Sequence, residues 1–475
     1  MRRPNVILVN CDDLGYGDLG CYGSEVHDTP AIDRLAGEGV RLTDFYMASP
    51  VCSPSRGAML TGCYPPRIGF DSFDGLNVLF PGMAQGLNPD EMTISRLLSE
   101  AGYATQIVGK WHCGDQPEFL PTQHGFDSWL GLPYSNDMGR QPATFTDEQL
   151  DAIRARGIPL PDFDYPPLPL MLDDQIIEAQ PDQAALTARY LQESIRFLRA
   201  NEDQPFFLYF AHMYVHLPIY VQPRFLAESR NGSYGAAVAC IDWALDVLLH
   251  ELEALGLADE TIVVFTSDNG ALARPGEGSN APLREKKGTT WEGGQRVPCI
   301  VRYPSVLPAG TECTEVATAM DLYPTIAAWC GVDVPDHPVI DGRDLGPTLQ
   351  EGAASPHDAF FYWNGPFLEA VRSGRWKLHV HKRAFGPTPT DPIEELYDLE
   401  ADVGETIDVA AQHPEVVKRL QALLADARAE LGDAVQAVEG NARRPVGRVV
   451  EPQKLGAFDP EHPYYMAEYD LADRG

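Results

Sequence analysis

The sequence predicts an α/β fold in which helices flank a large central mixed sheet, followed by a smaller α+β domain. Short apolar runs rich in β-branched residues, such as 5–10 and 261–266, alternate with helical segments and are typical of strands buried on both faces. Beyond about residue 350 the runs become short and alternating, as in a short antiparallel sheet. At 475 residues the chain is also too long for one compact core. We predict a large domain over residues 1–350, an α+β subdomain over residues 351–440 and a C-terminal tail over residues 441–475.

The composition, 44% hydrophobic and 22% charged, is typical of a water-soluble globular protein. No apolar run approaches the ~20 residues that a membrane-spanning helix needs. The nine cysteines are scattered without a Cys-x-x-Cys pair, which suggests neither a disulfide framework nor a zinc site. The stretch before Asp12 leaves no room for a secretory signal. We therefore expect a cytoplasmic protein with no membrane partner.

The formal net charge of −33 restricts the partners more than the fold. Such a surface repels nucleic acid, anionic membranes and heavily sulfated polymers, because each contact with a polyanion works against the summed field. A small substrate with one anionic group is compatible with this charge. Acidity that only keeps the protein soluble is an equally good interpretation.

The first predicted strand, residues 5–10, is followed by the paired carboxylates Asp12 and Asp13. Adjacent carboxylates repel each other unless a cation or a set of donors holds them, and open α/β sheets bind ligands at the carboxyl ends of their strands. A metal site and a turn cap are equally good interpretations of this pair alone. A helix is then expected from Pro30, with Thr29 as its N-cap.

Residues 52–62, Cys-Ser-Pro-Ser-Arg-Gly-Ala-Met-Leu-Thr-Gly, are the stretch around which the site is expected to form. Pro54 bars regular helix before Ser55, so Cys52 is expected at a helix N-terminus. Unpaired N–H groups at that end would hold an anion and lower the pKa of the cysteine, making it reactive. A buried structural cysteine is the alternative.

A helix over about 92–101 and a strand over 104–108 lead to Lys110 and His112. These two side chains would face one side if the segment stays extended. A solvated lysine and a capping or core histidine are the alternatives.

The segment 138–183 is rich in proline and lacks strong periodicity, which favours a surface excursion that forms a pocket wall. A helix over about 184–200 and a strand over 205–210 follow, and then His212 and His216. Their spacing would suit zinc on a helix, but a proline two residues later favours a loop, so we discount that metal.

A helix over about 234–255 and the strand 261–266 lead to Asp268 and Asn269. Their side-chain oxygens would add to those of Asp12 and Asp13 as metal ligands. Such an all-oxygen set suits a hard cation such as calcium or magnesium. A plain Asp-Asn-Gly turn is the alternative. A glycine-rich loop, 286–294, follows.

The region after residue 350 is expected to contain four short strands and one helix. The strands are expected near 360–363, 369–373, 376–381 and 395–399, and the helix near 415–431. The tail has no clear period, and we expect it to lie against the body or a neighbouring subunit.

Three of these stretches resemble signatures of the type I, formylglycine-dependent sulfatases of the alkaline-phosphatase superfamily. They are Cys-x-Pro-Ser-Arg-x-x-x-Leu-Thr-Gly from Cys52, the stretch 102–112, and Lys-Gly-Thr-x-x-Glu-Gly-Gly from Lys287. The segment 138–183 is similar to that of the arylsulfatase A branch. The resemblance, from Asp12 to about Ala410, implies an alkaline-phosphatase-like sandwich with residues 1–350 as the catalytic domain, and it is weak for substrate.

The resemblance also implies a role for each motif residue. Cys52 would be oxidised to formylglycine, and one hydroxyl of its hydrated aldehyde would attack sulfur. His216, helped by Lys287, would protonate the leaving alcohol, and His112 would take a proton from the second hydroxyl so that sulfate leaves. The implied catalytic residues are Cys52, Arg56, Lys110, His112, His216 and Lys287. The implied substrate-binding residues are Ser135, Lys110, His216 and Lys287, and the implied metal ligands are Asp12, Asp13, Cys52, Asp268 and Asn269.

The implied activity is that of an arylsulfatase acting on sulfate monoesters of small aryl or alkyl alcohols. Calcium is the implied metal, with magnesium as the alternative, and a formylglycine-generating enzyme is the implied partner for maturation. No nucleic acid or membrane partner is expected, and a homo-oligomer is left open. A phosphate or phosphonate ester hydrolase of the same superfamily could use the same residues. A non-catalytic anion-binding protein with unmodified Cys52 is the other alternative.

Overall fold

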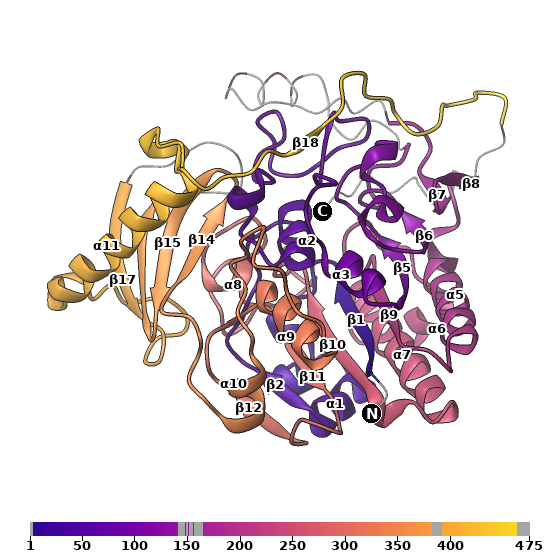
Figure 1. The fold of residues 1–475 in the computed structure, drawn as a ribbon, viewed down its shortest axis with the longest axis horizontal. Coiled ribbons are helices and arrows are strands. Elements are labelled where there is room, and N and C mark those ends of the chain that lie inside the picture. Colours follow the sequence, from indigo (N-terminus) through magenta and orange to yellow (C-terminus); the bar gives the residue numbers. More distant parts are fainter. Residues whose placement is uncertain are drawn as a thin grey trace.

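A ten-stranded mixed sheet forms the centre of the computed structural model (Figure 1). The structure describes residues 3–140, 165–381 and 392–462, together with residues 148, 151 and 155. Within these residues the strand order is β12-β2-β11-β10-β1-β9-β5-β6-β7-β8. The strands are β1 (Asn5–Cys11), β2 (Val40–Leu42), β5 (Ala104–Lys110), β6 (Ser128–Leu132), β7 (Pro169–Leu172), β8 (Gln175–Ala179), β9 (Phe206–Ala211), β10 (Thr261–Ser267), β11 (Cys299–Arg302) and β12 (Thr311–Cys313).

The inner strands β10, β1, β9, β5 and β6 are parallel, whereas both flanks of the sheet contain antiparallel pairs. The predicted central mixed sheet is therefore confirmed. Successive residues of β1 point to opposite faces, so Ile7 and Val9 enter one apolar core while Val6 and Leu8 enter the other. Burial on both faces explains why this strand reads as a continuous apolar run.

Helices cover both faces of the sheet (Figure 1). On one face lie α1 (Pro30–Glu38), α5 (Leu186–Ala200), α6 (Pro223–Glu228) and α7 (Gly232–Ala254). On the other lie α2 (Cys52–Thr61), α3 (Ile94–Glu100), α9 (Leu322–Trp329) and α10 (Gly346–Glu351). The parallel inner strands thus all deliver their carboxyl ends to one edge of a covered sheet, where ligands of open α/β folds bind.

Helix α7 is long and apolar enough to cross a membrane by length and composition, which corrects the expectation that the chain has no such run. An 18-residue window of it has a mean hydropathy of 1.3, and 61% of that window is buried within the fold. The helix packs against α1, α5 and α6. Its apolar surface is therefore accounted for by packing inside the domain.

The C-terminal region forms a separate four-stranded antiparallel sheet, as predicted. Its strands are β14 (Phe360–Asn364), β15 (Phe367–Ser373), β16 (Trp376–His381) and β17 (Pro392–Asp398), and α11 (Pro414–Leu431) packs on β15 and β16. The core of this sheet is shared with the first domain, because Tyr46, Ala58 and Met320 pack in the same cluster as Phe360 and Leu420. The two domains are therefore joined by buried apolar surface.

The chain after α11 returns to the first domain, as Figure 1 shows in yellow. There β18 (Gly447–Arg448) pairs with β4 (Gln85–Gly86), and Arg444 Nε donates to Glu91 at 2.7 Å. The expectation that the tail lies against the body holds for this part. Residues 463–475 and 156–164 lie outside the described residues, and so do most of residues 141–155 of the proline-rich segment.

Candidate active site

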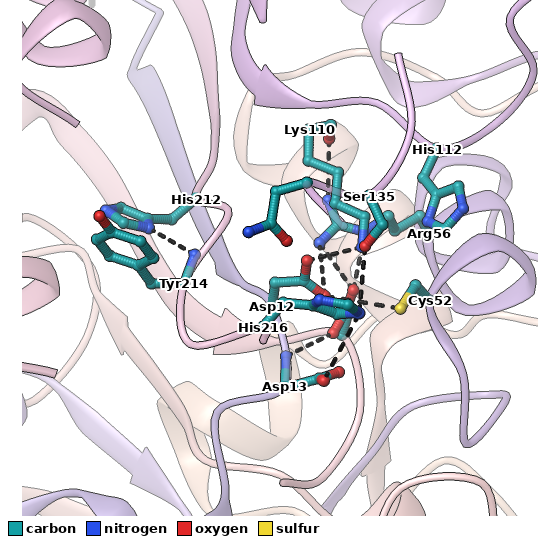
Figure 2. A network of polar contacts seen from close by, with 12 residues as sticks. Asp12, Asp13, Cys52, Arg56, Lys110, His112, Ser135, His212, Tyr214 and His216 are labelled. Carbon is teal, nitrogen blue, oxygen red and sulfur yellow. Dashed lines mark hydrogen bonds and ion pairs between the residues drawn. The ribbon is translucent and has the colours of Figure 1, made fainter. Parts of the chain in front are cut away.

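The motif residues meet at the carboxyl edge of the parallel strands (Figure 2). Asp12 and Asp13 follow β1, Asp268 follows β10, and Lys110 is the last residue of β5. Cys52 is the first residue of α2, and His216 lies on the loop after β9. Residues up to 275 positions apart in the sequence thus form one cluster. We call it the site cluster, and its members are Asp12, Asp13, Cys52, Arg56, Lys110, His112, Ser135, His216, Asp268, Asn269 and Lys287.

Three carboxylates of the site cluster are each paired with a cationic side chain. Lys110 Nζ lies 2.7 Å from Asp12 Oδ2, and Lys287 Nζ lies 2.8 Å from Asp13 Oδ2. Arg56 Nε donates to Asp268 Oδ2 at 2.8 Å. These charged groups are buried, so each needs its partner. The formal charges of these three pairs cancel.

The cations also set the ionisation of the first two carboxyls. Burial would raise the pKa of Asp12, but Lys110 and His216 outweigh burial and hold the pKa below its ordinary value. Burial likewise opposes ionisation of Asp13, and Lys287 outweighs it and lowers the pKa. Both groups are therefore anionic oxygen donors at neutral pH.

Cys52 lies where the sequence predicts, at the start of α2, with its side chain directed at the site cluster. The residue is only 2% exposed, and its Sγ lies 3.6 Å from Asp12 Oδ1. The expectation of a depressed pKa is wrong. Burial raises the pKa of the Cys52 thiol, because the opposing effects of Lys110 and Lys287 are smaller than the cost of desolvating a thiolate.

His112 does not continue the extended segment on which its predicted alignment with Lys110 depended. The strand ends at Lys110, and His112 has a φ of 59°. Its Nε2 lies 3.0 Å from the carbonyl oxygen of Leu79, which accepts a hydrogen bond, so Nε2 carries the proton. Its Nδ1 is buried and has no partner among the described residues. Burial, reinforced by Lys110, holds the pKa of His112 well below its ordinary value, which leaves Nδ1 as a free base.

His216 and Ser135 lie beside each other and close to the carboxylates. His216 Nδ1 lies 2.6 Å from the Leu217 carbonyl, so that Nε2 faces the cluster. That Nε2 lies 3.2 Å from Ser135 Oγ and 4.0 Å from Asp13 Oδ2. Ser135 Oγ also accepts a hydrogen bond from Lys110 Nζ at 3.0 Å. The predicted substrate-binding residues are thus brought together.

His212 lies apart from the site cluster, beside Tyr214 in Figure 2. Its Nδ1 accepts a hydrogen bond from the Tyr214 backbone at 3.0 Å, and its Nε2 lies 3.2 Å from Thr187 Oγ1. The segment is a loop rather than a helix, as predicted. His212 is therefore a buried structural histidine.

Four side chains of the cluster lie close enough together to hold a metal ion. Asp12, Asp13, Cys52 and His216 each offer one atom within 4.8 Å of the others. The amide of Asn269 donates to Asp13 Oδ1 at 2.7 Å, while Asn269 Oδ1 is buried and has no partner among the described residues. A buried amide oxygen without a donor among the described residues, on a side chain that contacts a carboxylate, is a candidate ligand for a hard cation such as calcium or magnesium.

Three contributors to the site were missed by sequence reasoning. Ser55 Oγ donates to the carbonyl of Asp268 at 2.5 Å, and Ser53 Oγ accepts from the Leu79 backbone at 3.1 Å. Ser53 and Ser55 stand within the cysteine motif, which could have signalled a role. Leu79 acts through its backbone, which no sequence pattern reports.

The chain matches two family models. The model described as Sulfatase matches residues 4–332, and the model described as the C-terminal region of aryl-sulfatase matches residues 355–449. Together they span both domains.

Two curated relatives and one solved structure illustrate the similarity. Arylsulfatase A from Homo sapiens is 38% identical over 461 residues, which cover 89% of this chain and 87% of that protein. Steryl-sulfatase from Mus musculus is 36% identical over 520 residues, which cover 91% of this chain and 83% of that protein. The crystal structure of Ps i-CgsB in complex with k-i-k-neocarrahexaose aligns with a TM-score of 0.77 at 30% identity, covering 90% of this chain and 92% of that one. The neighbouring solved structures include sulfatases of the alkaline-phosphatase fold.

Proposed function

The chain belongs to the sulfatase family, and on this premise we propose that it hydrolyses sulfate monoesters of small aryl or alkyl alcohols at the site cluster. The observation that carries the proposal is the convergence of Arg56, Lys110 and Lys287 on buried carboxylates around the side chain of Cys52. The charges of these three cationic side chains and of their three carboxylate partners cancel in the protein alone. A bound divalent cation would therefore give the cluster an excess of about two positive charges. That excess suits an anionic ester and its more negative transition state.

Cys52 is the proposed position of the nucleophile, after conversion to formylglycine. The hydrated aldehyde supplies one hydroxyl to attack sulfur and a second whose deprotonation releases sulfate. The position of Cys52 supports this role, since its Sγ lies 3.6 Å from Asp12 and is enclosed by the site cluster. Maturation requires a formylglycine-generating enzyme as a partner.

Asp12, Asp13, Asp268, Asn269 and the modified position 52 are the proposed ligands of a calcium ion, with magnesium as the alternative. Such a cation supplies positive charge to stabilise an ionised hydroxyl and the transferring sulfuryl oxygens. This set is all-oxygen once Cys52 is converted to formylglycine, which suits a hard cation. The buried Oδ1 of Asn269, which has no partner among the described residues, also supports the assignment.

Two histidines are the proposed proton carriers. His112 donates from Nε2 to the Leu79 carbonyl, and its Nδ1 is unprotonated and has no partner in the described part of the chain, so it can accept a proton at that atom. His216 presents Nε2 beside Ser135 and Asp13. Its Nδ1–H donates to the Leu217 carbonyl, so the imidazolium form carries a second proton on Nε2, and that proton can be donated to the oxygen of the departing alcohol. Lys287, held on Asp13, supports that donation.

The deciding experiment combines mass analysis with turnover. The peptide bearing Cys52 from protein produced together with a formylglycine-generating enzyme is expected to carry the aldehyde mass, and that protein is expected to hydrolyse an aryl sulfate. A phosphate ester and a phosphonate ester of the same phenol serve as comparison substrates. Unmodified Cys52 without turnover, or faster hydrolysis of the phosphorus esters, would contradict the proposal.

The preference for small substrates rests on charge. The whole chain carries −33, whereas the site cluster gathers cations, so a substrate meets a repulsive exterior and an attractive centre. An aryl or steryl alcohol that carries one sulfate is compatible with the negative exterior and the cationic centre. A polymer with many sulfates is not, because most of its charge would meet the negative exterior. We expect faster hydrolysis of an aryl sulfate than of a heparin-like polymer, with added salt helping the polymer more because salt screens the repulsion. A preference for the polymer at low ionic strength would refute the charge argument.

We also propose a cytoplasmic location. All nine cysteines are free thiols in the structure, which is compatible with a reducing compartment. Fractionation of the producing cells tests this proposal.

A further inference from the structure

Lys287 lies on an irregular segment, residues 287–291, that leads into α8 (Glu292–Gln295). Because no helix or strand fixes this segment, the position of the Lys287 amine depends on other contacts of its backbone. Toward the first domain, the Lys287 N–H donates to Ala271 at 3.0 Å and the Gly288 N–H donates to Pro50 at 2.9 Å. Pro50 lies two residues before Cys52, so the segment is tied to the chain that carries the nucleophile position.

The other side of the segment is held by the C-terminal sheet. Asn364 Nδ2, on β14, donates to the carbonyl of Gly288 at 3.1 Å. Lys377 Nζ, on β16, donates to the carbonyl of Thr290 at 2.8 Å. The Thr290 hydroxyl donates to Glu369 Oε2, on β15, at 2.7 Å. Three strands of the second domain thus hold the segment that carries Lys287.

The anchor at Lys377 is fully buried and charged. Its Nζ lies 2.9 Å from both Glu292 Oε1 and Glu405 Oε1, and none of these three side chains is exposed. Glu405 Oε2 in turn accepts the backbone N–H of Glu292 at 2.8 Å. We call Glu292, Lys377 and Glu405 the interdomain cluster. Because any displacement would leave a buried charge unpaired, this arrangement holds the start of α8 in one position.

We propose that Asn364 and Lys377 are positioning residues that place the Lys287 amine from the C-terminal domain. The inference rests on the proposed function, in which Lys287 supports sulfate binding and departure of the alcohol. Both side chains reach the segment through backbone carbonyls, which lie one and three residues after Lys287. Displacement of a catalytic group by about 1 Å can cost roughly 100-fold in rate, so such remote contacts matter.

The first test compares Asn364→Ala and Lys377→Met with the matched control Arg375→Ala. Arg375 lies in the same domain and forms an ion pair with Asp398 that is partly exposed. We expect both test variants to lower kcat for an aryl sulfate at least tenfold with a smaller change in KM, and the control to stay within twofold of the wild type. If Lys377→Met does not fold, Asn364→Ala decides, because it removes an uncharged side chain and leaves no buried charge unpaired. Wild-type kcat in a folded Asn364→Ala protein would overturn the proposal.

The second test separates positioning from general loosening. In a Lys287→Ala background, adding Asn364→Ala is expected to change kcat by less than twofold, since the group to be positioned is gone. A further tenfold loss in that background would show that Asn364 acts independently of Lys287.

Calorimetric binding of inorganic sulfate provides a readout that does not require turnover. Asn364→Ala is expected to weaken sulfate binding in the wild-type background and to leave it unchanged in the Lys287→Ala background. If the wild-type protein does not turn over an aryl sulfate, the proposed function is contradicted. If Asn364→Ala weakens sulfate binding equally in the wild-type and Lys287→Ala backgrounds, the positioning role is contradicted.

Discussion

Two clusters of buried charge flank the segment 287–292, and they differ in how completely their polar atoms are satisfied. In the interdomain cluster, Glu292 Oε1 accepts from Tyr362 and Lys377, while Oε2 accepts from Tyr46 and contacts Arg296. Both oxygens of Glu405 also have partners. In the site cluster, by contrast, Asn269 Oδ1 and His112 Nδ1 are buried without partners among the described residues.

This difference separates a structural cluster from one prepared for chemistry. An unpartnered buried acceptor costs free energy unless a ligand supplies its partner. The interdomain cluster has no such position on its carboxylates, so it stabilises one geometry. The site cluster leaves positions open for a cation and a proton, and its stability is therefore expected to depend on what it binds.

The largest expected contrast is in activity and follows from Cys52→Ala. We expect this variant to lose aryl sulfate turnover by at least ~10⁴-fold, because the nucleophile is absent. Its thermal unfolding should shift little, since only a small buried side chain is shortened. Cys52→Ser should instead accumulate a sulfated serine detectable by mass, because a single hydroxyl lacks the second proton that releases sulfate. Continuous turnover by Cys52→Ser, or unfolding of Cys52→Ala, would place Cys52 with the structural residues.

The next contrast is in stability and follows from Glu292→Gln. The substitution keeps the shape of the side chain but leaves Lys377 with one carboxylate fewer, and breaking a buried ion pair costs about 3 kcal/mol. Denaturant unfolding should report that loss, while metal content stays at the wild-type level. An unchanged midpoint would mean that Glu405 alone compensates Lys377 and that the two clusters are less different than the contacts indicate.

The sequence predicted the site better than its surroundings. Asp12, Lys110 and Asp268 were predictable because each lies at or just beyond the carboxyl end of a buried strand, and these ends meet at one edge of a parallel sheet. Element boundaries were close, as for the helix expected at 92–101, which spans Ile94–Glu100.

The features that could not be predicted depend on contacts between residues far apart in the sequence. Lys377 and Asn364 lie on strands whose alternation was recognised, but no local pattern places them against Thr290 and Gly288. The raised pKa of Cys52 was missed because the helix N-terminus is visible in the sequence and the extent of burial is not.

A third contrast is in metal binding. Asp13→Asn removes one negative oxygen from the proposed ligand set, so we expect metal affinity to fall roughly tenfold or more. Glu405→Gln, in the interdomain cluster, is the matched control and should retain the wild-type metal content after dialysis. Elemental analysis measures both. Equal metal content in the two variants would place the cation elsewhere.

The smallest expected effect is in the pH dependence of stability, and it again concerns Glu292. Burial would raise the pKa of this carboxyl, but Lys377 and Arg296 outweigh burial and hold the pKa well below the ordinary value of 4.5. A carboxyl whose pKa is depressed in the folded state binds fewer protons there than in the unfolded state. Its contribution to the free energy of unfolding is therefore complete above about pH 4.5 and is lost as the pH falls further.

Glu292→Gln cannot lose that contribution on acidification, because its amide does not titrate. The difference in unfolding free energy between the wild type and this variant should therefore be constant from pH 7 to about pH 5 and should shrink below about pH 4.5. Denaturant unfolding at a series of pH values, with the Arg375→Ala control in parallel, measures the difference. A gap that stays constant down to pH 3 would show that ionisation of Glu292 does not stabilise the interdomain cluster and that its hydrogen bonds alone do so.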